Sequence, residues 1–146
     1  EMVNFLIENG ADINVVNGEN ESALMYAIQK ENLEIVQLLV ENGINIHLKD
    51  SKGYTALLYA SKTSNLDIVK YLISKGGNIK DKTNKGYNAL IEACCNDKFD
   101  IVKYLIEYGI DINEQANGGG NALILGIGHA NIEIIKYLVK NGIDIN

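Results

Sequence analysis

The 146-residue sequence contains no proline, no tryptophan and only two histidines. It lacks any apolar run close to the roughly 18 residues that a membrane-spanning helix needs, and it has no recognisable signal peptide. A metal site needs several ligands at suitable spacing, and His47 and His129 lie far apart in the sequence. We therefore expect no metal, no cofactor and no insertion into a membrane.

Basic residues are also fewer than acidic ones: the sequence has 13 Lys and Arg and 19 Asp and Glu, which gives a net charge of −6. Nucleic acids and anionic membrane surfaces repel an acidic protein, so neither is expected as the main partner. The two cysteines, Cys94 and Cys95, are adjacent and could pair only in a strained ring. The absence of a structural disulfide favours a reducing compartment, either the cytoplasm or an intracellular compartment of a host. Since the sequence begins with Glu1, we expect it to be part of a longer chain.

What the sequence does have is an internal repeat with a period of 33 residues. Glycine keeps this period at Gly10, Gly43, Gly76, Gly109 and Gly142. Three further columns keep it as well: Ala23, Ala56, Ala89 and Ala122; Leu24, Leu57, Leu90 and Leu123; Ile35, Ile68, Ile101 and Ile134. A fixed period of this length predicts a stack of similar structural units.

Each unit has the pattern of two helices joined by a turn. The first helix is expected to begin after a capping residue, because a side-chain oxygen can accept hydrogen bonds from the free N–H groups of a first turn. The residues in this position are Ser22, Thr55, Asn88 and Asn121. The second helix is expected to begin after Asn32, Asn65 and Asn131 in three of the units.

The second helix has further signals at both ends. Acidic residues occupy its first turn, where the helix dipole favours negative charge: Glu34, Asp67, Asp100 and Glu133. A glycine at the end of the helix supplies the left-handed conformation that terminates it: Gly43, Gly76, Gly109 and Gly142. The remaining residues of each unit alternate apolar side chains with turn residues, which suits an extended loop or hairpin.

These features resemble the ankyrin-repeat family, whose 33-residue unit carries a T-P-L-H-x-A motif and a G-A-D-x-N motif. The second motif occurs as GADIN at 10–14 and as GIDIN at 109–113 and 142–146. The first occurs as SALMYA, TALLYA, NALIEA and NALILG, with alanine in place of proline and an apolar residue in place of histidine. The resemblance implies an all-α solenoid with a partial repeat at 1–16 and full repeats at 17–49, 50–82, 83–115 and 116–146.

The stretch NGGGNALILGIGHAN, residues 117–131, could suggest a nucleotide site, since glycine-rich loops before a helix can hold phosphate. Such a loop also needs a preceding strand and usually a nearby lysine, and neither is present. In the repeat register Gly119 is a hairpin glycine and Gly126 occupies a position that has room only for a small side chain. Gly126 and Gly128 lie inside one predicted helix, where each should cost about 1 kcal/mol relative to alanine. We therefore expect the fourth repeat to be the least stable.

Residues that could carry chemistry show no catalytic arrangement. Cys94 is expected to be a small buried residue, and Cys95 a more exposed thiol with no base or cation placed to activate it. The acids Glu92 and Asp97 show no pairing suited to acid–base catalysis. The sequence therefore predicts a protein that is not an enzyme.

The family resemblance implies a protein–protein interaction module that binds with its hairpin tips and the inner face of its first helices. Transferred position by position, that face comprises Glu19, Glu21, Gln29, Lys30, Ser51, Lys52, Tyr54, Lys62, Thr63, Asn84, Lys85, Tyr87, Cys95, Asn96, Asn117 and His129, together with Gly18, Gly118, Gly120 and Gly128.

Two tyrosines one repeat apart, Tyr54 and Tyr87, adjoin Lys52 and Lys85 on this face. Exposed tyrosines are frequent hot spots of binding, so this ladder, with Lys62, could contact an acidic or polar segment of a partner. Alternatively, the tyrosines lie over neighbouring loops and the lysines are solvated. A different set of tyrosines shares a helical register with Phe5 and Leu38 and should make partly buried contacts between repeats: Tyr71, Tyr104 and Tyr137.

The ends of the array suggest a second class of function. Terminal repeats normally carry a polar outer face, yet the last helical segment, IEIIKYLVKN, is as apolar as its internal counterpart LDIVKYLISK. Residues 1–9 similarly supply a second helix with no first helix before it. Either further repeats cover these ends in a longer array, or copies of the chain associate end to end as a structural assembly.

Overall fold

The computed structural model describes residues 8–63, 65–130 and 132–145, and within these ranges it contains eight helices and no strand. The helices are α2 (Ala23–Gln29), α3 (Leu33–Glu41), α4 (Ala56–Thr63), α5 (Leu66–Ser74), α6 (Ala89–Cys95), α7 (Phe99–Tyr108), α8 (Ala122–Gly126) and α9 (Ile132–Lys140). The prediction of an all-α repeat fold is confirmed. The helix pairs lie inside the four predicted full repeats, whose precise boundaries remain a prediction.

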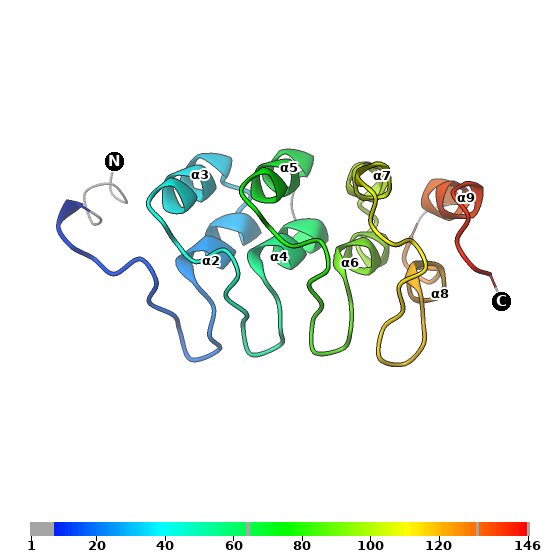
Figure 1. The fold of residues 1–146 in the computed structure, drawn as a ribbon, viewed down its shortest axis with the longest axis horizontal. Helices are drawn as coiled ribbons and strands as arrows, with labels where there is room; N and C mark the ends of the chain where they lie inside the picture. The colour runs from blue at the N-terminus through cyan, green and yellow to red at the C-terminus, as the bar shows by residue number, and fades with distance from the viewer. Residues whose placement is uncertain (1–7, 64, 131, 146) are drawn as a thin grey trace.

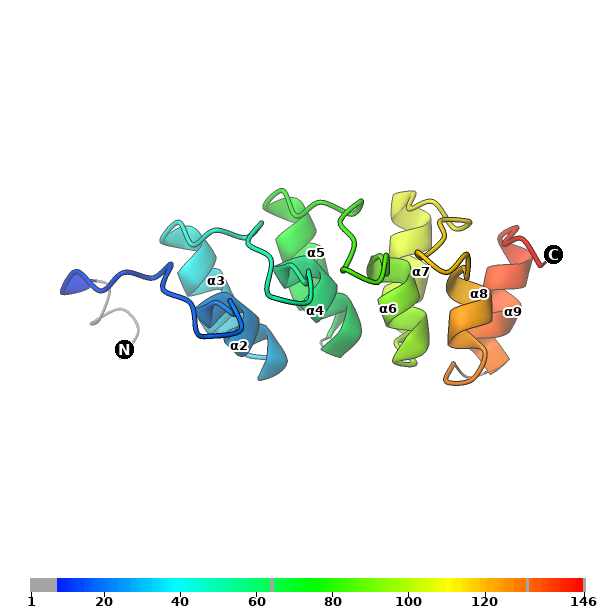
Figure 2. The ribbon, with the colours of Figure 1, turned by 90° about the horizontal axis from the view of Figure 1, so that it is seen from below.

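The helices form two layers along an elongated molecule (Figure 1). The first helices α2, α4, α6 and α8 lie beside the hairpin loops, and the second helices α3, α5, α7 and α9 form the other layer. Seen from below, the helix pairs stack side by side along the long axis (Figure 2). Each first helix packs on the first helix of the next repeat, so that repeats contact mainly their neighbours.

Most of the helices have a side-chain capping hydrogen bond at their N-terminus, as the sequence predicts. The side chains of Ser22, Asn88, Asn121, Asn32 and Asn65 each accept a hydrogen bond from the backbone N–H three residues later. The prediction is wrong for Thr55, because its buried Oγ1 has no hydrogen-bond partner among the described residues. The α4 helix nevertheless begins there, since the Thr55 carbonyl accepts from the Tyr59 N–H at 3.0 Å. The predicted cap at Asn131 lies outside the described residues.

The expected helix ends are also present. The first turns of the second helices contain the predicted acidic residues Glu34, Asp67, Asp100 and Glu133. The terminating glycines all have left-handed backbone: Gly43, Gly76, Gly109 and Gly142. Both signals are local, which explains why a single sequence was sufficient to place them.

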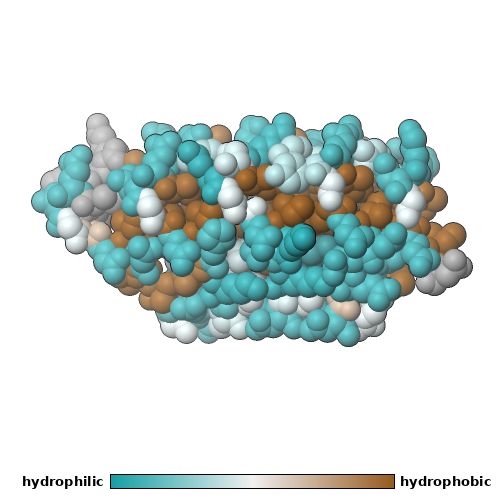
Figure 3. All heavy atoms as spheres, viewed as in Figure 1, coloured by the Kyte–Doolittle hydropathy of each residue, from teal (hydrophilic) through white to brown (hydrophobic). Residues whose placement is uncertain are grey.

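Side chains between the two layers form one continuous core. The leucine column at Leu24, Leu57, Leu90 and Leu123 is buried throughout. The three tyrosines of the second helices, Tyr71, Tyr104 and Tyr137, are partly buried against this core, as predicted. In Figure 3 apolar side chains form a band between the polar hairpin side and the polar outer helices.

The fourth repeat departs from the predicted helix length. The α8 helix ends at Gly126, so the expectation that Gly128 lies inside it is wrong. Two helix-weakening glycines within three residues provide the physical reason for the early end. The small-residue requirement at Gly126 is confirmed, because an added Cβ would lie 3.0 Å from the Cβ of Cys94 in α6.

Candidate functional site

Four hairpins project from the first-helix layer, at residues 17–21, 50–54, 83–87 and 116–120, and are here called the first to fourth hairpins (Figure 1). Each is closed by a hydrogen bond from the N–H of its first residue to the carbonyl of its last, at 2.9 to 3.1 Å. The glycine-rich stretch therefore begins as an ordinary hairpin of the repeat, with Gly119 in the same left-handed conformation as Gly53 and Gly86.

Successive hairpins are joined to each other through their backbones. The N–H groups of Ser51, Asn84 and Asn117 donate to carbonyls of the preceding hairpin at 2.8 to 3.1 Å. The side chains of Asn84 and Asn117 add a second hydrogen bond each, at 3.0 and 2.8 Å. These predicted contact residues therefore also hold the row of hairpins together.

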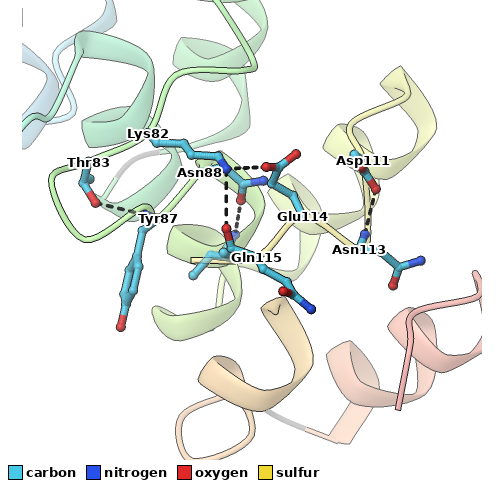
Figure 4. Close-up of polar contacts among 9 residues, drawn as sticks. Lys82, Thr83, Tyr87, Asn88, Asp111, Asn113, Glu114 and Gln115 are labelled. Carbon is cyan, nitrogen blue, oxygen red and sulfur yellow. Dashed lines mark hydrogen bonds and ion pairs between the residues drawn. The ribbon is translucent and has the colours of Figure 1, made fainter. Parts of the chain in front are cut away.

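The third hairpin is additionally fixed by contacts of Lys82, the residue before it, with the segment that precedes the fourth hairpin (Figure 4). Lys82 forms an ion pair with Glu114 and donates to the Gln115 carbonyl at 3.4 Å. The Thr83 hydroxyl accepts a hydrogen bond from the Tyr87 N–H at 3.1 Å. Figure 4 shows the Tyr87 ring pointing away from the Lys82 cluster, so the third hairpin presents this ring on its other side.

A pocket of about 620 Å³ lies between the second and third hairpins, α4 and α6, and we refer to it as the central pocket. Its lining is Ser51, Lys52, Tyr54, Lys62, Thr83, Asn84, Lys85, Tyr87, Glu92, Cys95, Asn96, Leu125 and His129. Ten of the predicted contact residues are therefore brought together in one place. Asn117 lies in a neighbouring pocket between the third and fourth hairpins, and Tyr87 lines both.

Glu92 is the one acidic side chain of the central pocket, and the sequence interpretation missed its importance. The residue is 2% exposed, and its carboxylate accepts a hydrogen bond from the Tyr54 hydroxyl at 2.6 Å. Burial raises the pKa of Glu92, and the hydrogen bond from Tyr54 and the charges of Lys62 and Lys85 offset part of this effect. A signal was available, because the equivalent residues are Tyr26, Tyr59 and Leu125, all bulkier and uncharged.

The two tyrosines of the predicted ladder are partly buried, so their description as exposed is wrong. The Tyr54 ring lies 4.9 Å from the Tyr59 ring, and the ammonium group of Lys62 lies 5.0 Å from its centre. The pKa of Tyr54 is raised, mainly by burial and to a smaller extent by the hydrogen bond to Glu92. Tyr54 is thus a packed wall of the pocket, in contact with residues of α4 and α6.

The lysines of the central pocket are not neutralised by ion pairs. Lys52, Lys62 and Lys85 have no carboxylate within ion-pair distance among the described residues. Lys62 is half-buried, whereas Lys52 and Lys85 are exposed. The pocket therefore has a local excess of positive charge, although the chain as a whole is acidic.

The predicted contact residues of the first repeat lie outside the central pocket. Glu21 accepts hydrogen bonds from Asn17, Tyr26 and Tyr59 at 2.8 to 3.2 Å. The bonds from Asn17 and Tyr26 lower the pKa of the Glu21 carboxyl. Glu19 accepts a hydrogen bond from the Ser51 hydroxyl at 2.8 Å. This end of the hairpin row is therefore negatively charged and internally hydrogen-bonded.

The other predicted residues outside the pocket differ in their surroundings. Gln29 and Lys30 are exposed at the end of α2. The Thr63 hydroxyl donates to the Tyr59 carbonyl four residues earlier in α4, at 2.8 Å.

The two cysteines have different environments. Cys94 is fully buried in α6, as predicted, and burial raises the pKa of its thiol to about 12. Cys95 is half-buried and its thiol donates to the Leu125 carbonyl at 3.4 Å. Burial and the nearby Glu92 raise the pKa of Cys95, which disfavours the reactive thiolate. The described residues contain no group of three His, Cys, Asp or Glu side chains that could hold a metal ion.

Comparison with known proteins supports the repeat assignment. A family model described as "Ankyrin repeats (3 copies)" matches residues 1–83 and 76–146, which together span the chain. No curated protein matches the sequence. In the part of the chain that the structure describes, no helix has the length and apolar character needed to cross a membrane.

Proposed function

The chain belongs to the ankyrin-repeat family, and we propose that it binds a protein partner through its hairpin tips and the inner face of its first helices. Ankyrin repeats are generally protein–protein interaction modules, and the family is typically non-enzymatic. The observation that carries the proposal is the central pocket, where residues from two hairpins and three first helices converge.

The physical character of the pocket supports this role. Its walls include Tyr54 and Tyr87, and tyrosine is enriched in surfaces that bind other proteins. The hairpins that form its edges are hydrogen-bonded to each other, so little conformational entropy would be lost when a partner binds. A partner segment that crosses the row of hairpins would contact several repeats at once.

A selection of binding peptides from a random dodecapeptide library tests the proposal for a partner segment of any sequence. Lys52→Trp places a bulky side chain at the edge of the pocket, and Lys70→Trp makes the same change on the exposed face of α5. We expect the selected peptides to lose binding to the first variant and to keep it for the second. Peptides that bind both variants equally well would contradict the proposed surface.

A second candidate function is end-to-end stacking of copies of the chain, and two surfaces favour it. At one end Ile124, Ile127 and Val139 are more than half exposed on the fourth repeat. At the other end the first repeat has a groove of about 630 Å³ lined by Ala23, Ala27 and other mainly apolar residues. In the following repeats the corresponding face of the first helix is covered by the first helix of the repeat before it.

In a stack of two copies, α8 of one copy would occupy this groove of the next, forming a head-to-tail contact. Light scattering over a hundredfold range of concentration tests this candidate. A molar mass that rises from 16.0 kDa with concentration, and that stays constant for Ile127→Glu, is the expected result. A mass that is constant for the unmodified chain would contradict stacking.

A further inference from the structure

We infer that the central pocket recognises carboxylate side chains in a short acidic segment of the protein partner, and that Lys62 and Lys85 bind them. This inference rests on the proposed function, because it specifies the chemistry of the segment that the same surface would bind. The observation behind it is that Lys62 and Lys85, which come from different repeats, line the same pocket as one buried carboxylate, Glu92, which already accepts a hydrogen bond from Tyr54.

Lys62 and Lys85 approach the pocket from two different elements. Lys62 projects from the last turn of α4, where its ammonium group lies over the Tyr54 ring at 5.0 Å from the centre. Lys85 projects from the tip of the third hairpin. Both lysines line the same pocket as Glu92, yet among the described residues neither ammonium group comes within ion-pair distance of the Glu92 carboxylate. One carboxylate therefore balances only part of the positive charge.

Glu92 is held in a way that leaves the lysines available. Its carboxylate is buried and accepts the hydrogen bond from Tyr54, so it is fixed at the base of the pocket. Because it cannot move out to form a direct pair, it attracts the two ammonium groups towards the pocket without neutralising them. A carboxylate from a partner could approach both lysines from the open side and form charge-assisted hydrogen bonds.

The surroundings favour a short acidic peptide segment over a long polyanion. Glu19 and Glu21 give the neighbouring first hairpin a negative charge that would repel a nucleic-acid backbone extending along the row. The ring of Tyr87 and the side chain of Leu125 also line the pocket and would contact an apolar residue next to the acid. One or two carboxylates beside an apolar side chain match these features.

The same peptide selection also tests this inference when its products are sequenced and measured on lysine variants. We expect the selected peptides to be rich in Asp and Glu, and we expect Lys62→Met and Lys85→Met each to weaken their binding about tenfold. Lys70→Met is the matched control, because the Lys70 ammonium group also lies over a tyrosine ring, 5.6 Å from the centre of Tyr104, but on the second-helix layer. It should leave affinity unchanged.

Glu92→Gln provides a test in the opposite direction. The substitution keeps an oxygen that can accept the Tyr54 hydrogen bond and removes the charge that opposes an incoming carboxylate. We expect acidic peptides to bind this variant several-fold more tightly. If Glu92 had only a structural role, Glu92→Gln would not increase the affinity for acidic peptides.

The outcomes separate this inference from the proposed function. Peptides without acidic residues that still lose binding to Lys52→Trp would overturn the inference and leave the proposed function intact. Selected peptides that bind Lys52→Trp as tightly as they bind the unmodified chain would overturn both the inference and the proposed function. A single-stranded DNA dodecamer that binds through Lys62 and Lys85 more tightly than the acidic peptides would also overturn the inference, because it would assign the lysines to phosphate binding.

Discussion

The third and fourth repeats align in sequence, but side chains at equivalent positions are buried to different extents. Ile91 in α6 is 0% exposed, whereas its counterpart Ile124 in α8 is 54% exposed. Cys94 is 0% exposed, whereas its counterpart Ile127 is 65% exposed and more apolar. The α6 helix packs between α4 and α8, while α8 packs on α6 alone among the first helices described. Burial in this fold is therefore supplied by the neighbouring repeat and not by the hydrophobicity of the residue.

The same pair of repeats differs in helix length. The α6 helix extends from Ala89 to Cys95, and α8 ends after five residues at Gly126. The helices α8 and α9 also make less contact with each other than the corresponding pairs in the earlier repeats. A repeat with a shorter first helix and one free face has fewer interactions to lose, so it is expected to open before the others.

The largest expected effect comes from truncating the equivalent isoleucines. Ile91→Ala removes a fully buried side chain and should lower the free energy of unfolding by about 3 kcal/mol. Ile124→Ala removes a side chain that is already half exposed to solvent and should lower the free energy of unfolding by less than about 1 kcal/mol. Urea denaturation followed by circular dichroism measures both values.

The leucines one position earlier provide the control for this comparison. Leu90 and Leu123 are both buried, so their alanine variants should be destabilised by similar amounts. If Ile91→Ala and Ile124→Ala also had equal effects, the neighbouring repeat could not be the source of the difference in burial.

A second comparison concerns the hairpin glycines, which share a positive φ of 80° in the third and fourth repeats. A Cβ on Gly86 would lie 2.6 Å from the backbone nitrogen of Asn117, whereas a Cβ on Gly119 would meet nothing within 4 Å. Gly119→Ala should therefore cost only the backbone strain of about 1 kcal/mol. Gly86→Ala should cost about 2 kcal/mol or more, because the fourth hairpin must also move.

Thermal and urea denaturation of the two glycine variants measures this difference. Amide hydrogen exchange would show where the structure is weakened, because the Asn117 N–H of the fourth hairpin donates to the Lys85 carbonyl of the third. Faster exchange at Asn117 in Gly86→Ala, with no change in Gly119→Ala, is the expected pattern. Equal destabilisation would mean that the close approach of the hairpins does not limit the choice of residue.

The features that the sequence could predict are those that repeat or act locally. The 33-residue period placed the helix pairs, and the capping asparagines and terminating glycines placed their ends. The prediction of a side-chain cap failed at one position. Thr55 has the right residue type for a cap, but its hydroxyl makes no hydrogen bond in the described structure, and nothing in the sequence distinguishes it from Ser22.

The candidate site shows the same division. The register correctly grouped Tyr54, Lys62 and Lys85 on one face, because equivalent positions of a solenoid must align. It could not give the partial burial of Tyr54 or its hydrogen bond to Glu92, which lies 38 residues away in the sequence. The sequence pattern named Glu92 only among acids with no catalytic pairing, because its place in the pocket with the lysines depends on the packing of two repeats.

A smaller effect is expected from the glycines that shorten α8. Gly128 has no neighbouring atom within 4 Å of an added Cβ and no left-handed backbone. Gly128→Ala should therefore stabilise the chain by about 0.5–1 kcal/mol by restricting the unfolded state and favouring a longer helix. Gly126→Ala should gain little or nothing, because its Cβ would press against the Cys94 Cβ at 3.0 Å. Urea denaturation of both variants would test this, and equal stabilisation would contradict it.

The smallest effect concerns the position that is Glu92 in the third repeat and Leu125 in the fourth. Burial raises the pKa of Glu92 in the folded chain, so the folded state binds this proton more tightly than the unfolded state does. The ionised carboxylate therefore destabilises the fold as the pH rises through the ordinary carboxyl range and above it. Glu92→Gln should be more stable than the unmodified chain at pH 7, with the difference narrowing towards pH 4.

Tyr54→Phe sharpens this last prediction, because the hydrogen bond from the Tyr54 hydroxyl favours the charged form of Glu92. Without that hydrogen bond the pKa of Glu92 should rise further, and the stability lost between pH 4 and pH 7 should increase. Urea denaturation at a series of pH values for the three proteins measures both slopes. If Glu92→Gln tracked the unmodified chain at every pH, Glu92 would have the same pKa folded and unfolded, and the buried carboxylate would exert no electrostatic effect on the third repeat.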